Sequence, residues 1–263
     1  MTTDADPSER VIDHYQRLLA ANYTWMLGGD IERTAADQRD LLAGLLPPSH
    51  GARGTAVDLG SGSGAQSLAL ADLDYNPVLA VDTDSHLLAE LRVHAAGRPA
   101  VRTWEADALT AVAELDRGSV AVAVCMGDTL LHLASPAAVD ELFVQVGRVL
   151  QPGGVVVMTY RDLTGDLHGT DRFIPVRSDD EKIMMCFLDV ADPDVVEVHD
   201  IVHTRTDRGW VMTASSYPKL RLAPAWVHDE LYASGLEVVH HEPGPTGMWR
   251  TVARAAASRR SVR

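Results

Sequence analysis

A glycine-rich turn constrains the fold of this chain more than any other feature. The apolar segment Thr55–Leu59 is typical of a strand, and Ala65–Leu73 has the spacing of a helix. Between them, Gly60, Gly62 and Gly64 occupy alternate positions. Glycine accepts positive φ angles and lets a ligand approach the backbone closely, so this unit is typical of nucleotide-binding α/β proteins. It predicts an open sheet with a ligand at the carboxyl ends of its strands.

Strand-like and helix-like segments continue to alternate up to about residue 160, which indicates βα units around a mostly parallel sheet. Further strands are expected at Val78–Val81, Val101–Trp104, Val120–Met126 and Val155–Tyr160, and helices near Ser85–Ala95 and Ala137–Leu150. The second helix meets a strong stop signal at Gln151-Pro152-Gly153-Gly154. The pattern predicts a doubly wound α/β domain.

Two segments depart from this alternation. Residues 1–50 have helical spacing, whereas residues 161–219 contain strand patterns without helices between them. The second segment is predicted to be an antiparallel insertion with a hairpin turn at Asp207-Arg208-Gly209. Its strands are expected at Ile183–Val190, Val195–Thr206 and Trp210–Tyr217. A helix at Pro224–Ser234 and a final hairpin of Leu236–His241 and Met248–Ala253 follow it.

The charge and hydropathy of the chain exclude several classes of function. The 263 residues carry a net charge of −14, without a basic stripe. Such a protein repels a phosphate backbone, so no nucleic-acid substrate is expected. The longest apolar run, Val120–Met126, is shorter than a membrane span, and the first residues lack the pattern of a secretory signal. A cytoplasmic protein that binds no membrane is therefore expected.

Histidine and cysteine residues give no metal signal. No set of His, Cys and acidic residues has the spacing of a zinc site, so no metal is expected. Cys125 and Cys186 lie in apolar stretches and are interpreted as packed thiols.

An acidic residue beside the glycine turn distinguishes between two kinds of nucleotide. The glycines also fit the dinucleotide pattern, but Asp58, two residues before Gly60, would repel a pyrophosphate. A carboxylate at that position suits a ligand that carries an ammonium and a sulfonium group. The sequence Asp58-Leu59-Gly60-Ser61-Gly62-Ser63-Gly64 resembles the first motif of the class I S-adenosylmethionine-dependent methyltransferases. Among them, the small-molecule enzymes with an arrangement like that of glycine N-methyltransferase are the most similar.

Three further features fall in the order and spacing of that family: Asp82 ends the second strand, Asp107 follows the third, and the turn at 151–154 precedes the fifth. The resemblance implies a Rossmann-like, seven-stranded sheet, with residues 1–50 as a helical lid and residues 51–263 as the methyltransferase domain. It implies S-adenosylmethionine as the cofactor and S-adenosylhomocysteine as the product. The residues expected to bind the cofactor are Asp58, Gly60, Ser61, Gly62, Gly64, Asp82, Thr83, Asp107, Ala108 and Met126.

In that family the acid at the position of Asp82 binds the ribose hydroxyls, and the acid at the position of Asp107 lies near the adenine amino group. Each acid also has a structural interpretation, because Asp82, Asp84 or Asp107 would serve as the N-cap of the helix that follows. Open α/β sheets bind ligands at the carboxyl ends of their strands, which favours the cofactor site.

The acceptor is expected beside the carboxyl end of the fourth strand, which borders the methyl group in this fold. Asp128 and His132 lie four residues apart there, would share one face of a helix, and are candidates for accepting a proton from the acceptor. An N-cap for Asp128 and a partly buried helix position for His132 are the alternatives. The stretch lacks the Asn/Asp-Pro-Pro-Tyr sequence of nucleic-acid amino methyltransferases, which again favours a small acceptor.

Aromatic and basic residues supply the remaining candidates. Tyr15 is expected at the catalytic site, and Tyr23 and Trp25 are expected to contact the substrate, with core packing as the alternative. Arg161 and Arg172 are candidates for binding an acceptor carboxylate or sulfate, with a local salt-bridge network as the alternative.

The sequence therefore predicts methyl transfer from S-adenosylmethionine to an N, O or C centre of a small-molecule metabolite, in specialised metabolism. Two other hypotheses stay open. The same fold would also support a non-methylating reaction such as ring closure or another intramolecular displacement. A non-catalytic partner subunit would use the inserted strands as an interface. Either a homodimer or a partner protein is compatible with the sequence.

Overall fold

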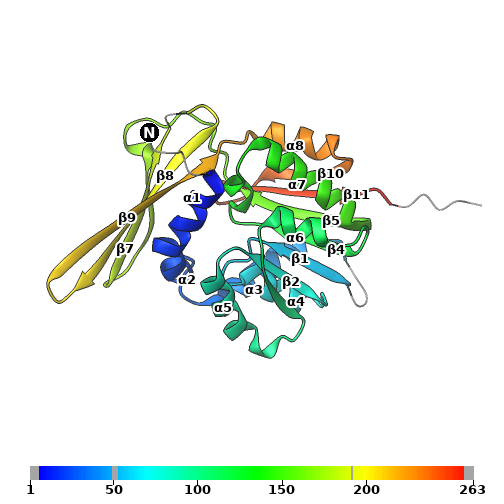
Figure 1. Ribbon diagram of the computed structural model, residues 1–263, viewed down its shortest axis with the longest axis horizontal. Coiled ribbons are helices and arrows are strands. Elements are labelled where there is room, and N and C mark those ends of the chain that lie inside the picture. Colours follow the sequence, from blue (N-terminus) through cyan, green and yellow to red (C-terminus); the bar gives the residue numbers. More distant parts are fainter. Residues whose placement is uncertain (1–5, 49–52, 191, 258–263) are drawn as a thin grey trace, which may run out of the picture.

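A seven-stranded sheet forms the centre of the computed structural model, which describes residues 6–48, 53–190 and 192–257 (Figure 1). Its strands are β1 (Thr55–Leu59), β2 (Val78–Asp82), β3 (Val101–Glu105), β4 (Val120–Cys125), β5 (Leu150–Tyr160), β10 (Leu236–Pro243) and β11 (Trp249–Ala255). They lie in the order β10-β11-β5-β4-β1-β2-β3. β1 to β5 are parallel, whereas β11 is antiparallel to β5 and β10 is antiparallel to β11.

Helices cover both faces of this sheet. On one face lie α3 (Ile31–Leu45), α4 (Ala65–Asp72) and α5 (Ser85–His94). On the other lie α6 (Ala108–Glu114), α7 (Pro136–Val149) and α8 (Pro224–Ala233). Successive side chains of a strand point to opposite faces, so Ala56 packs with the first set of helices and Val57 with the second. The predicted doubly wound, Rossmann-like fold is confirmed.

Polar caps fix where the helices begin at the carboxyl edge of the sheet. The Asp84 carboxylate accepts hydrogen bonds from the backbone N–H groups of His86 and Leu87, both at 2.9 Å, and so begins α5. Asp107 accepts one from the backbone N–H of Thr110 at 2.9 Å and begins α6. These caps satisfy donors that the first helical turn leaves free. The capping interpretation is therefore correct for Asp84 and Asp107.

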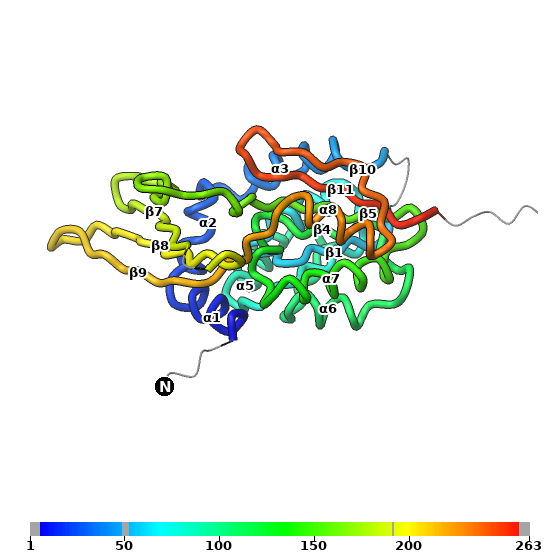
Figure 2. Tube along the Cα trace, turned by 90° about the horizontal axis from the view of Figure 1, so that it is seen from above, coloured from blue at the N-terminus to red at the C-terminus, as the bar shows by residue number. Residues whose placement is uncertain are grey.

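A second, four-stranded antiparallel sheet projects from the first (Figures 1 and 2). Its strands, in spatial order, are β6 (Phe173–Ser178), β7 (Lys182–Asp189), β8 (Val195–Thr206) and β9 (Gly209–Leu220). The turn between β8 and β9 lies where the sequence predicts it, with Thr206 paired to Gly209. This sheet contains the three antiparallel strands predicted between residues 161 and 219, and β6 as a fourth.

The N-terminal residues form helical segments beside the second sheet: α1 (Pro7–His14), a π-helical turn η1 (Tyr15–Leu19), a 3₁₀ turn η2 (Ala20–Asn22) and α2 (Tyr23–Met26). Leu18 and Leu19 pack against Met184 and Val202 of the second sheet. The predicted boundary at residue 50 lies outside the described residues. Short 3₁₀ turns complete the elements: η3 (Ala95–Gly97), η4 (Thr129–His132) and η5 (Gly169–Arg172).

Two local predictions are wrong. The strand β6 was not expected, because Pro175 and flanking charges obscure its apolar pattern; proline is tolerated here since β6 is an edge strand with a bulge. The residues 151–154 end α7 as expected but belong to β5 instead of preceding it. A Cβ on Gly154 would lie 3.0 Å from the carbonyl oxygen of Val120, so the glycine permits close approach where the β4–β5 register shifts.

In the described part of the chain, no helix combines the length and the apolar character that a membrane crossing requires.

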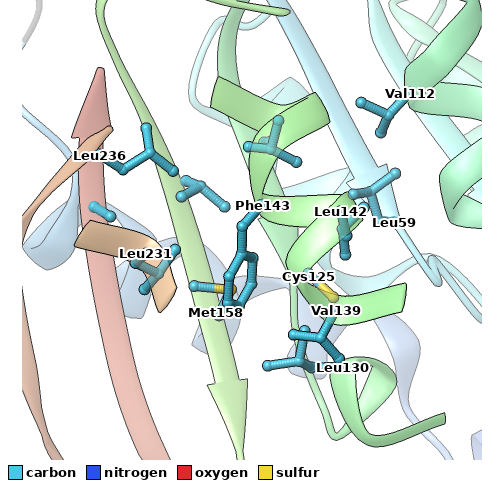
Figure 3. Packing of buried hydrophobic residues seen from close by; sticks show 14 of the residues in the cluster. Leu59, Val112, Cys125, Leu130, Val139, Leu142, Phe143, Met158, Leu231 and Leu236 are labelled. Atoms are coloured by element: carbon cyan, nitrogen blue, oxygen red, sulfur yellow. The ribbon is translucent and has the colours of Figure 1, made fainter. Parts of the chain in front are cut away.

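The core between the sheet and the α6–α7–α8 layer is built around Phe143. This ring is fully buried and points from α7 toward Met158 of β5 (Figure 3). Its neighbour Val144 faces solvent and is 57% exposed. Substituting alanine at each of these two adjacent positions therefore separates the effect of buried packing on stability from the effect of helix propensity.

We expect the substitution Phe143→Ala to lower the free energy of unfolding by about 3–5 kcal/mol, because it removes buried apolar area and leaves a cavity. Val144→Ala, the matched control, should change it by less than about 0.5 kcal/mol. Urea unfolding followed by circular dichroism measures both. Equal effects of the two substitutions would contradict the assigned packing.

Candidate functional site

Two adjoining cavities lie at the carboxyl ends of the parallel strands, with volumes of about 500 Å³ and about 150 Å³. Five residues line both cavities, and we refer to them as the dividing wall: Tyr15, Tyr23, Gly60, Gly127 and His132. They come from the N-terminal helices, the glycine turn and the segment after β4. Open α/β sheets bind ligands at this edge.

The smaller cavity is lined by residues that the sequence predicts for the ribose and adenine. Asp82, Thr83, Asp107 and Ala108 all border it. The Asp82 carboxylate accepts hydrogen bonds from the backbone N–H groups of Gly62 (2.8 Å) and Asp84 (2.9 Å). Burial raises the pKa of Asp82, although these hydrogen bonds oppose the effect. Asp107 both caps α6 and borders the cavity, so its two interpretations are compatible.

The glycine turn lets other groups pack directly on the backbone. A Cβ on Gly62, where φ is +54°, would lie 2.8 Å from Cε1 of Tyr23. A Cβ on Gly64, where φ is +102°, would lie 2.0 Å from Cδ1 of Leu91. Only glycine fits both positions without a shift. The turn thereby brings α5 and the N-terminal helices close to the end of β1.

Asp58 lies behind this turn. It is buried, accepts a hydrogen bond of 2.6 Å from the Ser67 hydroxyl, and is not among the described residues that line either cavity. Burial raises its pKa to about 7, and the nearby Asp82 contributes, while the bond from Ser67 opposes the shift. In this structure Asp58 therefore supports the turn through α4, and its predicted contact with a cationic ligand stays a prediction.

The larger cavity lies between the glycine turn, the end of β4 and the inner face of the second sheet. Ser61, Gly64 and Met126, all predicted for the cofactor, line it on one side. Asp200 and Tyr217 line it from β8 and β9. The insertion therefore supplies one wall of the cavity.

Asp128 lies at the centre of a buried charge cluster. Its carboxylate forms ion pairs with Lys219, at 2.9 Å from Nζ, and with the Arg161 guanidinium. The backbone N–H of Arg161 also donates to it, at 3.0 Å. Burial alone would raise the pKa of Asp128, but the charges of Lys219 and Arg161 lower it to about 2. The two cations and the backbone N–H of Arg161 occupy the oxygens of this carboxylate, so Asp128 is poorly placed to take a proton from an acceptor.

The helix-face argument for Asp128 and His132 is wrong, although both residues line the larger cavity. Asp128 precedes the short 3₁₀ turn η4 and has a φ angle of +77°, so no α-helical face joins the two residues. Asp128 does occupy the N-cap position of η4, as the alternative predicts, but its side chain makes no capping hydrogen bond there.

His132 is half-buried at the dividing wall, and its buried Nε2 atom has no hydrogen-bond partner in the part of the chain that the structure describes. The rings of Tyr15 and Tyr217 stand edge-on to it, with centroids 5.9 Å and 5.5 Å away. Burial, aided by the positive charge of Lys219, lowers the pKa of His132 to about 3. The imidazole is therefore neutral at physiological pH, with a nitrogen that can hold a proton or accept a hydrogen bond.

A second buried pair fastens the N-terminal helices to the second sheet. His14 Nε2 lies 2.9 Å from the Asp200 carboxylate, and the imidazole stacks on Tyr217 with centroids 4.1 Å apart. The Cys186 thiol donates to the same carboxylate at 2.8 Å. Tyr15 follows directly and reaches the dividing wall, where burial raises the pKa of its phenol.

Two predicted substrate residues lie elsewhere: neither Trp25 nor Arg172 belongs to the described lining of either cavity. The Trp25 indole donates to Asp179. Arg172 pairs with Asp189 and donates to the carbonyl of Leu188, as the salt-bridge alternative predicts. Arg161 does line the larger cavity, although its guanidinium is paired with Asp128.

The sequence analysis missed Lys219, Asp200 and Tyr217. Their signal was the period of two along the inserted strands, which places Asp200 between Val198 and Val202 on an otherwise apolar face. A carboxylate in such a position needs a partner. Nothing in the local sequence indicates that the partner is His14, which is 186 residues away in the chain.

In the described part of the chain, no group of three or more His, Cys, Asp and Glu residues is placed to hold a metal ion.

Residues 56–154, which include the glycine turn, Asp82, Asp107 and Asp128, match a family model described as a methyltransferase domain. Residues 56–154 therefore form a methyltransferase domain. No curated protein sequence matches the chain.

Solved structures of other methyltransferases have the same fold. The CcbJ methyltransferase from Streptomyces caelestis is 22% identical, with a TM-score of 0.70 over 96% of this chain and 99% of that chain. CalS10, an amino pentose methyltransferase from Micromonospora echinaspora, is 18% identical, with a TM-score of 0.70 over 91% and 97%. The sugar N-methyltransferase KedS8 from Streptoalloteichus is 17% identical, with a TM-score of 0.66 over 92% of both chains. At these identities the likeness shows the fold.

S-adenosylmethionine is the cofactor of this methyltransferase domain, and the site contains groups that fit it. The hydroxyls of Ser61 and Ser63 are buried and lack partners among the described residues, and both serines line the larger cavity. Buried hydroxyls without partners are rare. A carboxylate such as that of the methionine portion would satisfy them, while Asp82 and Asp107 supply acceptors for hydroxyl and amino groups at the other end.

We expect Asp82→Ala to weaken S-adenosylmethionine binding by about 10- to 100-fold, because it removes a charged hydrogen-bond acceptor from the smaller cavity. Isothermal titration calorimetry measures the dissociation constant. Glu105→Ala is the matched control, since Glu105 pairs with Asp82 in the β2–β3 register and is exposed. An unchanged affinity in Asp82→Ala would show that the ribose assignment is wrong.

The buried Asp58 predicts a pH dependence of stability. Its pKa rises from 3.8 to about 7 on folding, so the folded state binds this proton more tightly than the unfolded state does. The contribution of this proton to stability is complete below pH 4 and is lost as the pH rises through 7. In the cofactor-free protein, Asp58→Asn should therefore gain stability relative to wild type between pH 5 and pH 8.

Urea unfolding at both pH values tests this prediction. Asp116→Asn, at an exposed surface position, is the control. The measured quantity is the change, from pH 5 to pH 8, in the stability of each variant relative to wild type. If this change is no larger for Asp58→Asn than for Asp116→Asn, the prediction is contradicted.

Proposed function

We propose that the chain transfers the methyl group of S-adenosylmethionine to an N, O or C centre of a small-molecule metabolite bound in the larger cavity, as part of specialised metabolism. The observation that carries the proposal is the dividing wall. The predicted ribose and adenine residues lie on one side, and a cavity of about 500 Å³ lies on the other. That volume is within the range of small-molecule sites.

When bound, S-adenosylmethionine supplies an electrophilic methyl group on a sulfonium centre. The protein must align the acceptor with that group and exclude water. The N-terminal segments from α1 to α2 act in this proposal as a lid, since Tyr15 and Tyr23 close the site from above the glycine turn, whereas α3 packs on the central sheet. The cluster of Asp128, Arg161 and Lys219 keeps the inserted sheet in place against the end of β4.

His132 is the residue that we assign to the acceptor's proton. Its neutral Nε2 has no hydrogen-bond partner among the described residues, and at the dividing wall it would accept a proton from an N–H or O–H nucleophile as the nucleophile attacks. The ionised Asp128 positions Lys219 and Arg161 and takes no proton. Tyr15 stands edge-on to His132 and orients the imidazole.

Amino sugars are the first acceptors to test. Two proteins of the same fold carry the names amino pentose methyltransferase and sugar N-methyltransferase. A shared fold does not fix the substrate, so this choice is an analogy. Asp200 and the tyrosines on the cavity wall supply hydrogen-bonding groups for a polar acceptor of that size.

Two measurements on the purified protein test the proposal. Calorimetry should show micromolar binding of S-adenosylmethionine and of S-adenosylhomocysteine. Transfer of a labelled methyl group should then appear with at least one member of a panel of amino sugars, phenols and hydroxy acids. Cofactor binding with consumption of a substrate but no label transfer would indicate a repurposed reaction. No binding by the folded protein would indicate a non-catalytic subunit.

With an acceptor found in that screen, His132→Phe should lower turnover by about 10²- to 10⁴-fold, because it keeps the packed ring but removes the nitrogen. The cofactor's dissociation constant should change little. Since the pKa of His132 is about 3, wild-type turnover should show no midpoint near pH 6.5 from this group. His86→Phe, at an exposed position on α5, is the control. Full turnover in His132→Phe would mean that alignment alone drives the transfer.

A further inference from the structure

The second sheet has one covered face and one open face. Burial alternates along β8: Val196, Val198, Asp200 and Val202 are buried, whereas the residues between them are half-buried. The covered face packs on the N-terminal helices and lines the larger cavity. The strand register assigns every residue of the sheet to one face or the other. We call the open one the outer face.

The outer face is apolar. Antiparallel sheets with one solvated face normally carry polar side chains there. Here Trp210 and Met212 of β9 are 48% and 60% exposed, and Phe173 of β6 is 49% exposed. Polar residues, among them His199, His203 and Arg205, also lie on this face, but apolar residues outnumber them. Twelve apolar residues share it in the strand register: Phe173, Pro175, Ile183, Met185, Phe187, Val195, Ile201, Trp210, Met212, Ala214, Pro218 and Leu220. An exposed apolar surface of this extent indicates an interaction site.

The outer face is also free of the negative charge that dominates the chain. Among its residues the carboxylates are Asp189 and Glu197, and these pair with Arg172 and Arg10. In a chain with a net charge of −14, most of the surface repels a second copy. The outer face is where two copies approach with the least repulsion.

We propose that the outer faces of two chains pack together and form a homodimer. With a rise of about 3.3 Å per residue and a spacing of about 4.8 Å between strands, one face of the four-stranded sheet has a flat area of roughly 600 Å². The protruding side chains increase the accessible area beyond this value. A stable interface covers about 800 Å² on each partner. Two such sheets stacked face to face make a β-sandwich, whose cores are typically about 10 Å thick.

A second copy fits this surface better than a different protein does. An isologous contact brings the same apolar patch from both sides, so each exposed tryptophan and methionine meets apolar side chains. The face has few charges with which to select a charged partner. The inner face of the same strands carries Asp200 and Tyr217 into the larger cavity, so the dimer would also hold that wall in place.

The test is the mass of the full-length protein in solution, measured by sedimentation velocity between about 1 and 50 µM. Wild type should sediment with twice the chain mass of 28.4 kDa. The double substitution W210E/M212E should sediment as a monomer, because it places two charges on each copy within the apolar contact. Val211→Glu is the matched control: Val211 is 51% exposed at the same level of β9 but belongs to the other face, so this variant should stay a dimer.

Circular dichroism and S-adenosylmethionine titration confirm that each variant is folded, since these tip positions lie outside both cavities. A monomeric wild type at 50 µM would overturn the proposal. A wild-type dimer that W210E/M212E leaves intact would overturn it as well, because the contact would then lie elsewhere. Loss of the dimer in Val211→Glu alone would assign the contact to the opposite face and contradict it.

Discussion

The buried carboxylate of Asp128 joins the seven-stranded sheet to the second sheet, because Asp128 and its two partners follow or end different strands. Asp128 follows β4, Arg161 follows β5, and Lys219 lies near the end of β9. Lys219 and Asp128 are both almost fully buried, so each charge depends on the other for its stability. The cluster thereby fixes where the inserted strands meet the end of β4, and with them the wall of the larger cavity.

The charge cluster also explains the state of the neighbouring imidazole. His132 is half-buried beside a lysine and close to two tyrosines, and these surroundings keep it neutral. From the sequence, Asp128 and His132 are both candidates for accepting the acceptor's proton. In the structure the aspartate is ionised and held by two cations, whereas the imidazole is neutral. The aspartate positions other groups, and the imidazole, which lines both cavities, has a nitrogen without a hydrogen-bond partner among the described residues. We therefore assign the proton to His132 and the alignment to Asp128.

The sequence predicts the cofactor side of the site better than the acceptor side. Gly62, Asp82 and Asp107 lie in consecutive βα units, so local spacing is enough to bring them to one edge of a parallel sheet. Asp200 and Lys219 come from an antiparallel insertion whose docking depends on partners far away in the chain. Local patterns carry no information on such contacts.

Asp58 and Trp25 show a second limit of sequence interpretation. Asp58 belongs to the family motif, yet its carboxylate bonds to Ser67 behind the turn. The aromatic side chain of Trp25 suits contact with a substrate, yet its indole donates to Asp179 and lies against basic side chains of the second sheet. The residue type is correct for a ligand in both cases, and only the direction of the side chain decides its role.

We infer that the adenosine of the cofactor lies in the smaller cavity, that its methionine portion reaches Ser61 and Ser63, and that the acceptor lies in the larger cavity. A crystal structure with S-adenosylhomocysteine tests this arrangement most directly. The adenosine is expected against Asp82 and Asp107, and the sulfur atom at the dividing wall beside His132, facing the larger cavity. A sulfur atom turned away from that cavity, or adenosine bound outside the smaller one, would contradict this arrangement.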